Sequence, residues 1–148
     1  MPTRVDFYQL SRDPVELTVA KLATKATTAG HRLLVIAEHA ELRERISEAL
    51  WAHGKSDFLA HGDADAAHAP RQPIVLSATC AAPNDAAIAI VADGAWRSEC
   101  GAFERVMLLF DAQATDAARD VWRELAGRED IDNRIFKQTA AGGWREGR

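Results

Sequence analysis

The segment from 61 to 72, HGDADAAHAPRQ, gathers the side chains best suited to binding a metal ion. His61, Asp63, Asp65 and His68 carry imidazole and carboxylate groups, which zinc and manganese both accept as ligands. No further ligand set converges on these residues by spacing, and small polar loops commonly hold Asp and His because water solvates them. We therefore predict a polar loop here and no metal site.

The two cysteines and the first strand-to-helix turn are the other places where chemistry would be visible. Cys80 and Cys100 form no CxxC pair and have no motif that ties either to a histidine, so we expect two reduced structural thiols. A nucleotide site needs glycines at that turn, because backbone N–H groups must approach the phosphates closely. The turn is QLSRDPVEL, and GxGxxG, GxxxxGK[ST] and GxSxG are all absent from the sequence. The sequence predicts no cofactor and no enzyme activity.

A first candidate binding surface involves two aromatic residues near the end of the second expected helix. Trp51 is in line with Arg43 and Ser47 at four-residue spacing, on the polar flank of that helix, so its side chain should be partly exposed. Phe58 follows after the helix and can fold back beside it. Such a pair is typical of a surface that another protein covers, either a partner or a second copy of the chain. Alternatively, Trp51 and Phe58 close the edge of the core.

A second candidate surface lies in the segment ARDVWRELAG. Arg119, Trp122 and Arg123 follow one another at helical spacing, so their side chains meet on one face. Two guanidinium groups around an aromatic ring suit an anionic ligand with an apolar part, such as the acidic C-terminus of a peptide. Alternatively, Arg119 pairs with Asp116 or Glu124 and Trp122 packs on the core.

The elements that must position these residues alternate between strand and helix. This pattern predicts an α/β fold in three layers, with a mostly parallel sheet covered by helices on both faces. Asp13, Pro14 and Glu16 resemble an N-cap, a first-turn proline and a capping-box glutamate. The glycine-rich end of the chain should fray from about 144 to 148. We expect strands at 5–10, 31–38, 73–79, 87–94, 105–111 and 134–138, and helices at 13–30, 40–54 and 114–127.

Length, charge and hydrophobic content argue against several classes of protein. The 148 residues suit a single domain, 1–148, and the net charge of -4 argues against strong direct binding to nucleic acid. The first residues, MPTRVDFYQL, lack the apolar region of a signal peptide, and no apolar run is long enough to cross a membrane. We therefore expect a cytoplasmic protein.

Several segments together resemble the chi subunit of bacterial DNA polymerase III holoenzyme, in order and over almost the full length. These segments are VDFYQL, GHRLLVIAE, EALWAHGKSDFLAHG, RVMLLFD and ARDVWRELAG. The most specific match is Trp51 at the end of the second helix, followed by Phe58 and then His61. The resemblance implies a non-catalytic accessory protein with a Rossmann-like fold that lacks a nucleotide-binding loop.

The resemblance also implies two partners. Trp51 and Phe58 would belong to the surface that binds the psi subunit and, through psi, the clamp loader. Arg119, Trp122 and Arg123 would bind the acidic C-terminal tail of single-stranded DNA-binding protein, with an apolar residue of the preceding strand near Leu108 or Leu109.

This sequence departs from the family pattern at four positions. Trp122 replaces a tyrosine and Arg123 replaces a lysine, and both changes keep the chemistry. Thr115 stands where a lysine is usual, which removes one cationic contact, and Ala60 replaces a proline before the histidine. Arg134 or Lys137, on the last expected strand, would restore charge if they lay near the site.

Overall fold

The computed structural model describes residues 2–53 and 60–147. The longer helices are α1 (Val15–Thr28), α2 (Ala40–His53) and α3 (Thr115–Ala126), and the short 3-10 helices are η1 (Ala69–Arg71), η2 (Ser98–Ala102) and η3 (Ala112–Ala114). The strands are β1 (Thr3–Gln9), β2 (Leu33–Ile36), β3 (His61–Asp63), β4 (Ile74–Ser77), β5 (Ile88–Val91), β6 (Arg105–Phe110), β7 (Ile131–Gln138) and β8 (Trp144–Glu146).

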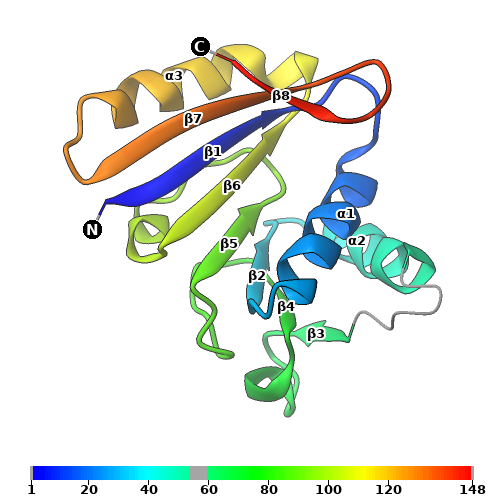
Figure 1. Ribbon diagram of the computed structural model, residues 1–148. Helices are drawn as coiled ribbons and strands as arrows, with labels where there is room; N and C mark the ends of the chain where they lie inside the picture. The colour runs from blue at the N-terminus through cyan, green and yellow to red at the C-terminus, as the bar shows by residue number, and fades with distance from the viewer. Residues whose placement is uncertain (1, 54–59, 148) are drawn as a thin grey trace.

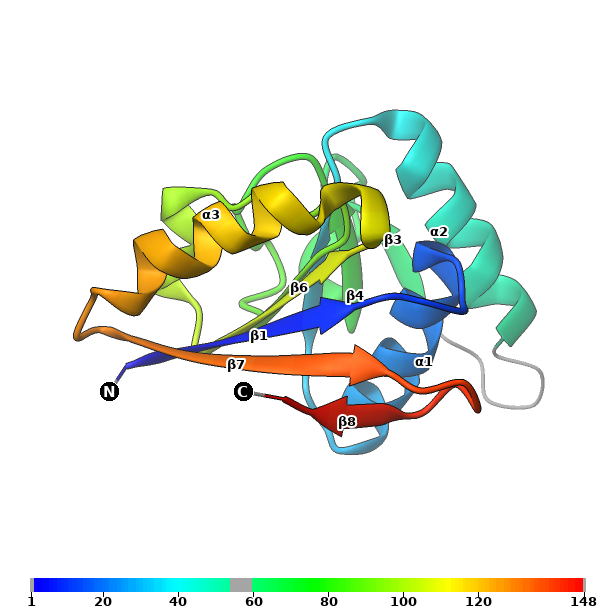
Figure 2. The same ribbon diagram turned by 90° about the horizontal axis from the view of Figure 1, so that it is seen from above.

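Within the described residues, the strands form one eight-stranded sheet in the order β3-β4-β2-β5-β6-β1-β7-β8. Neighbouring strands are parallel, except that β8 is antiparallel to β7. Helices α1 and α2 lie side by side against one face, and α3 packs against the other face along β7 (Figures 1 and 2). The predicted α/β, Rossmann-like fold with helices on both faces of a mostly parallel sheet is confirmed.

The central strands are apolar at every position because both faces of the sheet are covered. In β2, Leu33 and Val35 belong to the core under α1 and α2, whereas Leu34 and Ile36 belong to the core under α3. Successive side chains of a strand point to opposite faces. A run such as LLVI therefore supplies two cores at once, which is the pattern of a buried parallel strand.

The start of α1 differs from the prediction. Pro14 occupies the N-cap position and no side chain caps the helix there. The carboxylate of Asp13 instead accepts hydrogen bonds from Lys21 Nζ and Gln138 Nε2, each at 2.9 Å. Asp13 therefore connects α1 to the end of β7, because one of its oxygens accepts from both Lys21, two turns into the helix, and Gln138.

The end of the described chain is ordered, which corrects the expected frayed tail from Trp144. β8 pairs with β7, and the Trp144 ring packs edge to face on Tyr8 at 4.9 Å between ring centroids. The glycines that suggested disorder form the hairpin turn, where Gly142 has a φ of +91°. Glycine adopts that conformation without steric penalty.

Candidate functional site

A cavity of about 370 Å³ lies between α3 and the sheet, and we call it the α3 pocket. Its helical wall is regular, because positions 115, 118, 119 and 122 follow one face of α3. Its floor follows the strand register, in which Gln9 of β1 lies between Phe110 of β6 and Lys137 of β7. The residues that line the pocket are Phe7, Gln9, Phe110, Thr115, Ala118, Arg119, Trp122, Ile135 and Lys137.

Trp122 forms the apolar wall of the α3 pocket and also closes the core. Its ring packs edge to face on Phe7, with 5.0 Å between ring centroids, and its backbone carbonyl accepts a hydrogen bond from Asn133 Nδ2 at 3.2 Å. The alternative considered from the sequence is therefore present for Trp122, which does pack on the core, and Arg119 also lies near Asp116. The exposed side of the ring still faces the pocket, so the two roles are compatible.

Two cations from different elements border the α3 pocket. The Arg119 side chain is 68% exposed, and its Nη1 lies 3.9 Å from Asp116 Oδ1, a long and solvent-exposed ion pair. Such a pair contributes little stability, so the guanidinium can turn to a ligand at small cost. Lys137 is exposed on β7, across the pocket floor from α3. The aromatic side chains of the pocket and these two cations together suit an anionic group attached to an apolar one.

Two residues expected at this site do not line the pocket. Arg123 points to solvent with 76% of its side chain exposed, 3.7 Å from Asp120 Oδ1. Leu108 is fully buried beside Phe7 in the core under α3. The strand contributes Phe110 instead, two residues further along β6 on the same face, because the pocket opens at the carboxyl end of the strand. Leu109 faces the opposite core.

Three other positions were considered from the sequence because they could change the charge of the site, and they differ in whether they line the α3 pocket. Thr115 lines the α3 pocket without charge, and its hydroxyl donates to the carbonyl of Ala112 at 3.0 Å. Arg134 pairs with Asp132 at 3.2 Å. It alternates with Ile135 along β7 and so belongs to the opposite face. Lys137, which the sequence could not assign to the site, is the residue that brings the second charge.

Trp51 lies on the exposed flank of α2, as its helical position predicts. Its side chain is 51% exposed, the largest exposed apolar group in the described part of the chain. The ring stands 4.7 Å from the His61 ring, and His61 Nε2 is 2.8 Å from Ser47 Oγ. Strand β3 is thereby connected to α2. Phe58 lies outside the described residues.

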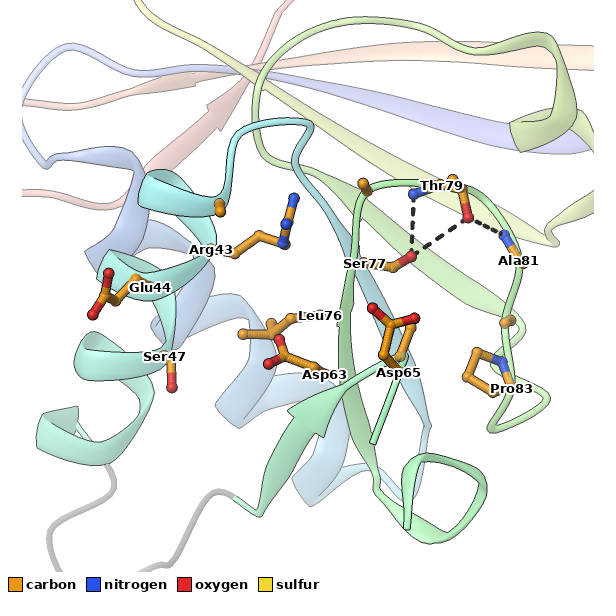
Figure 3. A pocket seen from close by; sticks show the side chains of 14 residues that line it. Arg43, Glu44, Ser47, Asp63, Asp65, Leu76, Ser77, Thr79, Ala81 and Pro83 are labelled. Carbon is orange, nitrogen blue, oxygen red and sulfur yellow. Dashed lines mark hydrogen bonds between the residues drawn. The ribbon is translucent and has the colours of Figure 1, made fainter. Parts of the chain in front are cut away.

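A larger cavity of about 820 Å³, which we call the α2 cleft, opens beside the same helix (Figure 3). Arg43, Glu44 and Ser47 of α2 form one side, and the loop from Thr79 to Pro83 forms the other (Figure 3). Its base is the carboxyl end of β4, where Ser77 Oγ accepts a hydrogen bond from the Thr79 N–H at 3.1 Å. Ser47 lines the cleft and also contacts His61, whose ring packs on Trp51.

Neither cofactor nor metal chemistry is apparent in the α2 cleft. Open α/β sheets bind ligands at the carboxyl ends of their strands, but the described residues that line this cleft include no glycine-rich loop. Arg43 Nη1 donates to the carbonyls of Ala37 and Glu38 at 2.6 and 2.8 Å, so its guanidinium holds the turn before α2. Across residues 2–53 and 60–147, no three His, Cys, Asp or Glu side chains are arranged to hold a metal ion.

The structure brings the two cysteines together, which spacing alone did not indicate. Cys80 follows β4 and Cys100 lies in η2, and their Sγ atoms are 3.0 Å apart. Burial and the neighbouring Cys80 sulfur raise the pKa of Cys100 to about 12. Both are free thiols.

Comparison with protein-family models decides the family. The model described as DNA polymerase III chi subunit, HolC, matches residues 1–130 of the chain. This chain belongs to the DNA polymerase III chi subunit family. Members are accessory, non-catalytic subunits of that polymerase, so the family assignment agrees with the resemblance found in the sequence. The match covers α2 and α3 and ends one residue before β7, so Ile135 and Lys137 lie beyond it.

A search among curated proteins found no match to the chain. In the described residues, no helix is long and apolar enough to cross a membrane.

Proposed function

We propose that this chi-family subunit is a cytoplasmic adaptor in DNA replication. It binds the acidic C-terminal tail of single-stranded DNA-binding protein in the α3 pocket and a psi-type subunit over α2, through which it joins the clamp loader. The observation that carries the first half is the α3 pocket itself, where Trp122, Phe7 and Phe110 lie within reach of Arg119 and Lys137. The family assignment supports the replication context.

The chemistry of the pocket suits a peptide that ends in an apolar residue. The terminal side chain would fill the space between Trp122 and the aromatic floor, because burial of apolar surface is the main source of affinity in such a site. Its carboxylate and the preceding acidic side chains would then face Arg119 and Lys137. Since both cations are solvent-exposed, the electrostatic part of the binding energy should be screened by salt.

A peptide titration tests this assignment. A labelled peptide copied from the C-terminus of the same organism's single-stranded DNA-binding protein should bind saturably by fluorescence anisotropy, and more weakly at high salt. Arg119→Ala should weaken binding several-fold, whereas Arg123→Ala should change it little. Arg123 is the matched control because it makes the same charge change one turn further along α3 but lies outside the pocket. Equal losses from both variants would mean that only general charge attracts the peptide.

The second half of the proposal rests on the exposed Trp51 side chain. An aromatic group that is half exposed beside a large cleft is typical of the central contact in a protein interface. A psi-type chain that covered Trp51 and entered the α2 cleft would contact Ser47 and Arg43 on the same face of α2.

Co-purification with the psi-type subunit of the same organism tests the α2 surface. Trp51→Ala should abolish a complex that Arg45→Ala, an exposed position of α2 outside the cleft, leaves intact. Sedimentation of the protein alone separates the alternative. A dimer that Trp51→Ala disperses would show that a second copy of the chain, and not psi, occupies this surface.

A further inference from the structure

The cysteine pair lies apart from the α3 pocket and serves neither proposed partner contact directly. Cys80 belongs to the loop that forms the far wall of the α2 cleft, between the lining residues Thr79 and Ala81. Cys100 sits in η2, fully buried in the core under α3. The two are the only cysteines of the chain.

The sulfur atoms are already close to bonding distance. At 3.0 Å they form an S–H···S hydrogen bond, and a disulfide needs them to approach by about a further 1 Å. Cys80 is half-buried and Cys100 is inaccessible, so an oxidant from solvent reaches Cys80 first. Redox-sensor proteins use the same arrangement, in which an accessible cysteine reacts with the oxidant and a second, resolving cysteine lies beside it.

Arg97 adds positive charge to the pair. The pKa of Arg97 is raised mainly by its hydrogen bonds to Asp93, with smaller electrostatic contributions from Asp93 and from both cysteine sulfurs. The guanidinium is held in place by that ion pair, with Nη2 3.0 Å from Asp93 Oδ2. A fixed cation beside a thiol favours reaction of its thiolate form with oxidants.

We propose that Cys80 and Cys100 are an oxidation site, which hydrogen peroxide converts into an intramolecular disulfide. The Cys80 thiolate attacks one peroxide oxygen, the O–O bond breaks, and the leaving hydroxide takes a proton to become water. Cys80 is then a sulfenic acid. The Cys100 sulfur attacks the Cys80 sulfur, an S–S bond forms, and the S–O bond breaks; the Cys100 proton passes to the leaving hydroxide, which departs as a second water. The two thiols lose two electrons and peroxide gains them.

The high pKa of Cys100 agrees with this order of events. Burial is the main cause, followed by the hydrogen bond and the charge of the Cys80 sulfur. A buried thiol that keeps its proton reacts slowly with peroxide, so Cys80 is oxidised first and Cys100 acts on the sulfenic acid. The disulfide would join the Thr79–Pro83 wall of the α2 cleft to η2 covalently.

Peroxide treatment of the full chain tests the proposal. After alkylation of remaining thiols under denaturing conditions, the intact mass should show both thiols lost together, a chain lighter by two hydrogen atoms, and full reversal by dithiothreitol. Cys100→Ser should stop at the sulfenic acid, with at least about tenfold more dimedone adduct than the parent, because the resolving thiol is missing. In Cys80→Ser, the buried Cys100 should remain alkylatable.

Several results would overturn it. They are disulfide-linked dimers in place of an intramolecular bond, oxidation of Cys80 with Cys100 still free, or equal dimedone trapping in the parent and Cys100→Ser. If Cys100→Ser does not fold, Cys80→Ser and the parent still decide the question, because rapid oxidation of Cys100 without Cys80 contradicts the assigned order.

Discussion

Replacement of Lys137 by glutamine should weaken binding of the acidic peptide about as much as the same change at Arg119. Both side chains are exposed cations at the rim of one pocket. An exposed charge contact contributes up to about 1 kcal/mol, which corresponds to a factor of about five in Kd. Arg119 is on α3 and Lys137 is on β7, so their effects should add to about 2 kcal/mol, or about thirtyfold, in the double variant.

The assay is the anisotropy titration at several salt concentrations. Each single variant should flatten the salt dependence of Kd, and the double variant should flatten it most, because fewer ionic contacts remain to be screened. The free energy of unfolding should change by no more than about 0.5 kcal/mol, as is usual for exposed positions. A Lys137→Gln protein that binds the peptide as tightly as the parent would refute the assignment of β7 to the site.

Three further predictions concern stability. Trp144→Ala should lower the free energy of unfolding in urea by about 2 kcal/mol, because it removes the ring packed on Tyr8 and loosens β8; an unchanged midpoint would mean that β8 adds nothing to the fold. Asp6→Asn should cost about 3 kcal/mol in the same assay, since this fully buried carboxylate accepts hydrogen bonds from two arginines. Burial acts to raise the pKa of Asp93, but hydrogen bonds from Arg97 and two backbone N–H groups outweigh it and lower the pKa. The stability that this provides is present above the ordinary Asp pKa of 3.8 and is lost as pH falls through the lower folded-state value. Asp93→Asn should therefore unfold with a shallower pH dependence in acid, and identical acid profiles would contradict it.

The sequence predicted the fold well because the residues of both core layers follow local patterns of apolar residues along single strands and helices. Apolar runs such as LLVI in β2 and the period of α3 can be recognised without knowing what lies beside them. The tail was misjudged for the opposite reason. Glycines before Trp144 suit a disordered end and a hairpin turn equally, and only the pairing with β7 separates the two.

The composition of the α3 pocket was only partly predictable. Alternation along β6 shows that Leu108 and Phe110 share a face, but not how far along the strand the pocket opens. That depends on the four residues between β6 and α3, which bring the start of α3 back over the carboxyl end of the strand. Lys137 could not be assigned because β7 reaches the site across β1, and the cysteine contact joins two loops in the same non-local way.

The strand order has a consequence for how a bridging protein works. From β4, at the α2 cleft, to β7, at the α3 pocket, there are five steps across the sheet, or about 24 Å at the usual strand spacing. The strands between them are packed on both faces and form a stiff spacer. We therefore expect occupancy of one surface to leave the affinity of the other unchanged, with a coupling free energy near zero. The strength of the bridge would come from the high effective concentration of two tethered partners and not from communication between sites.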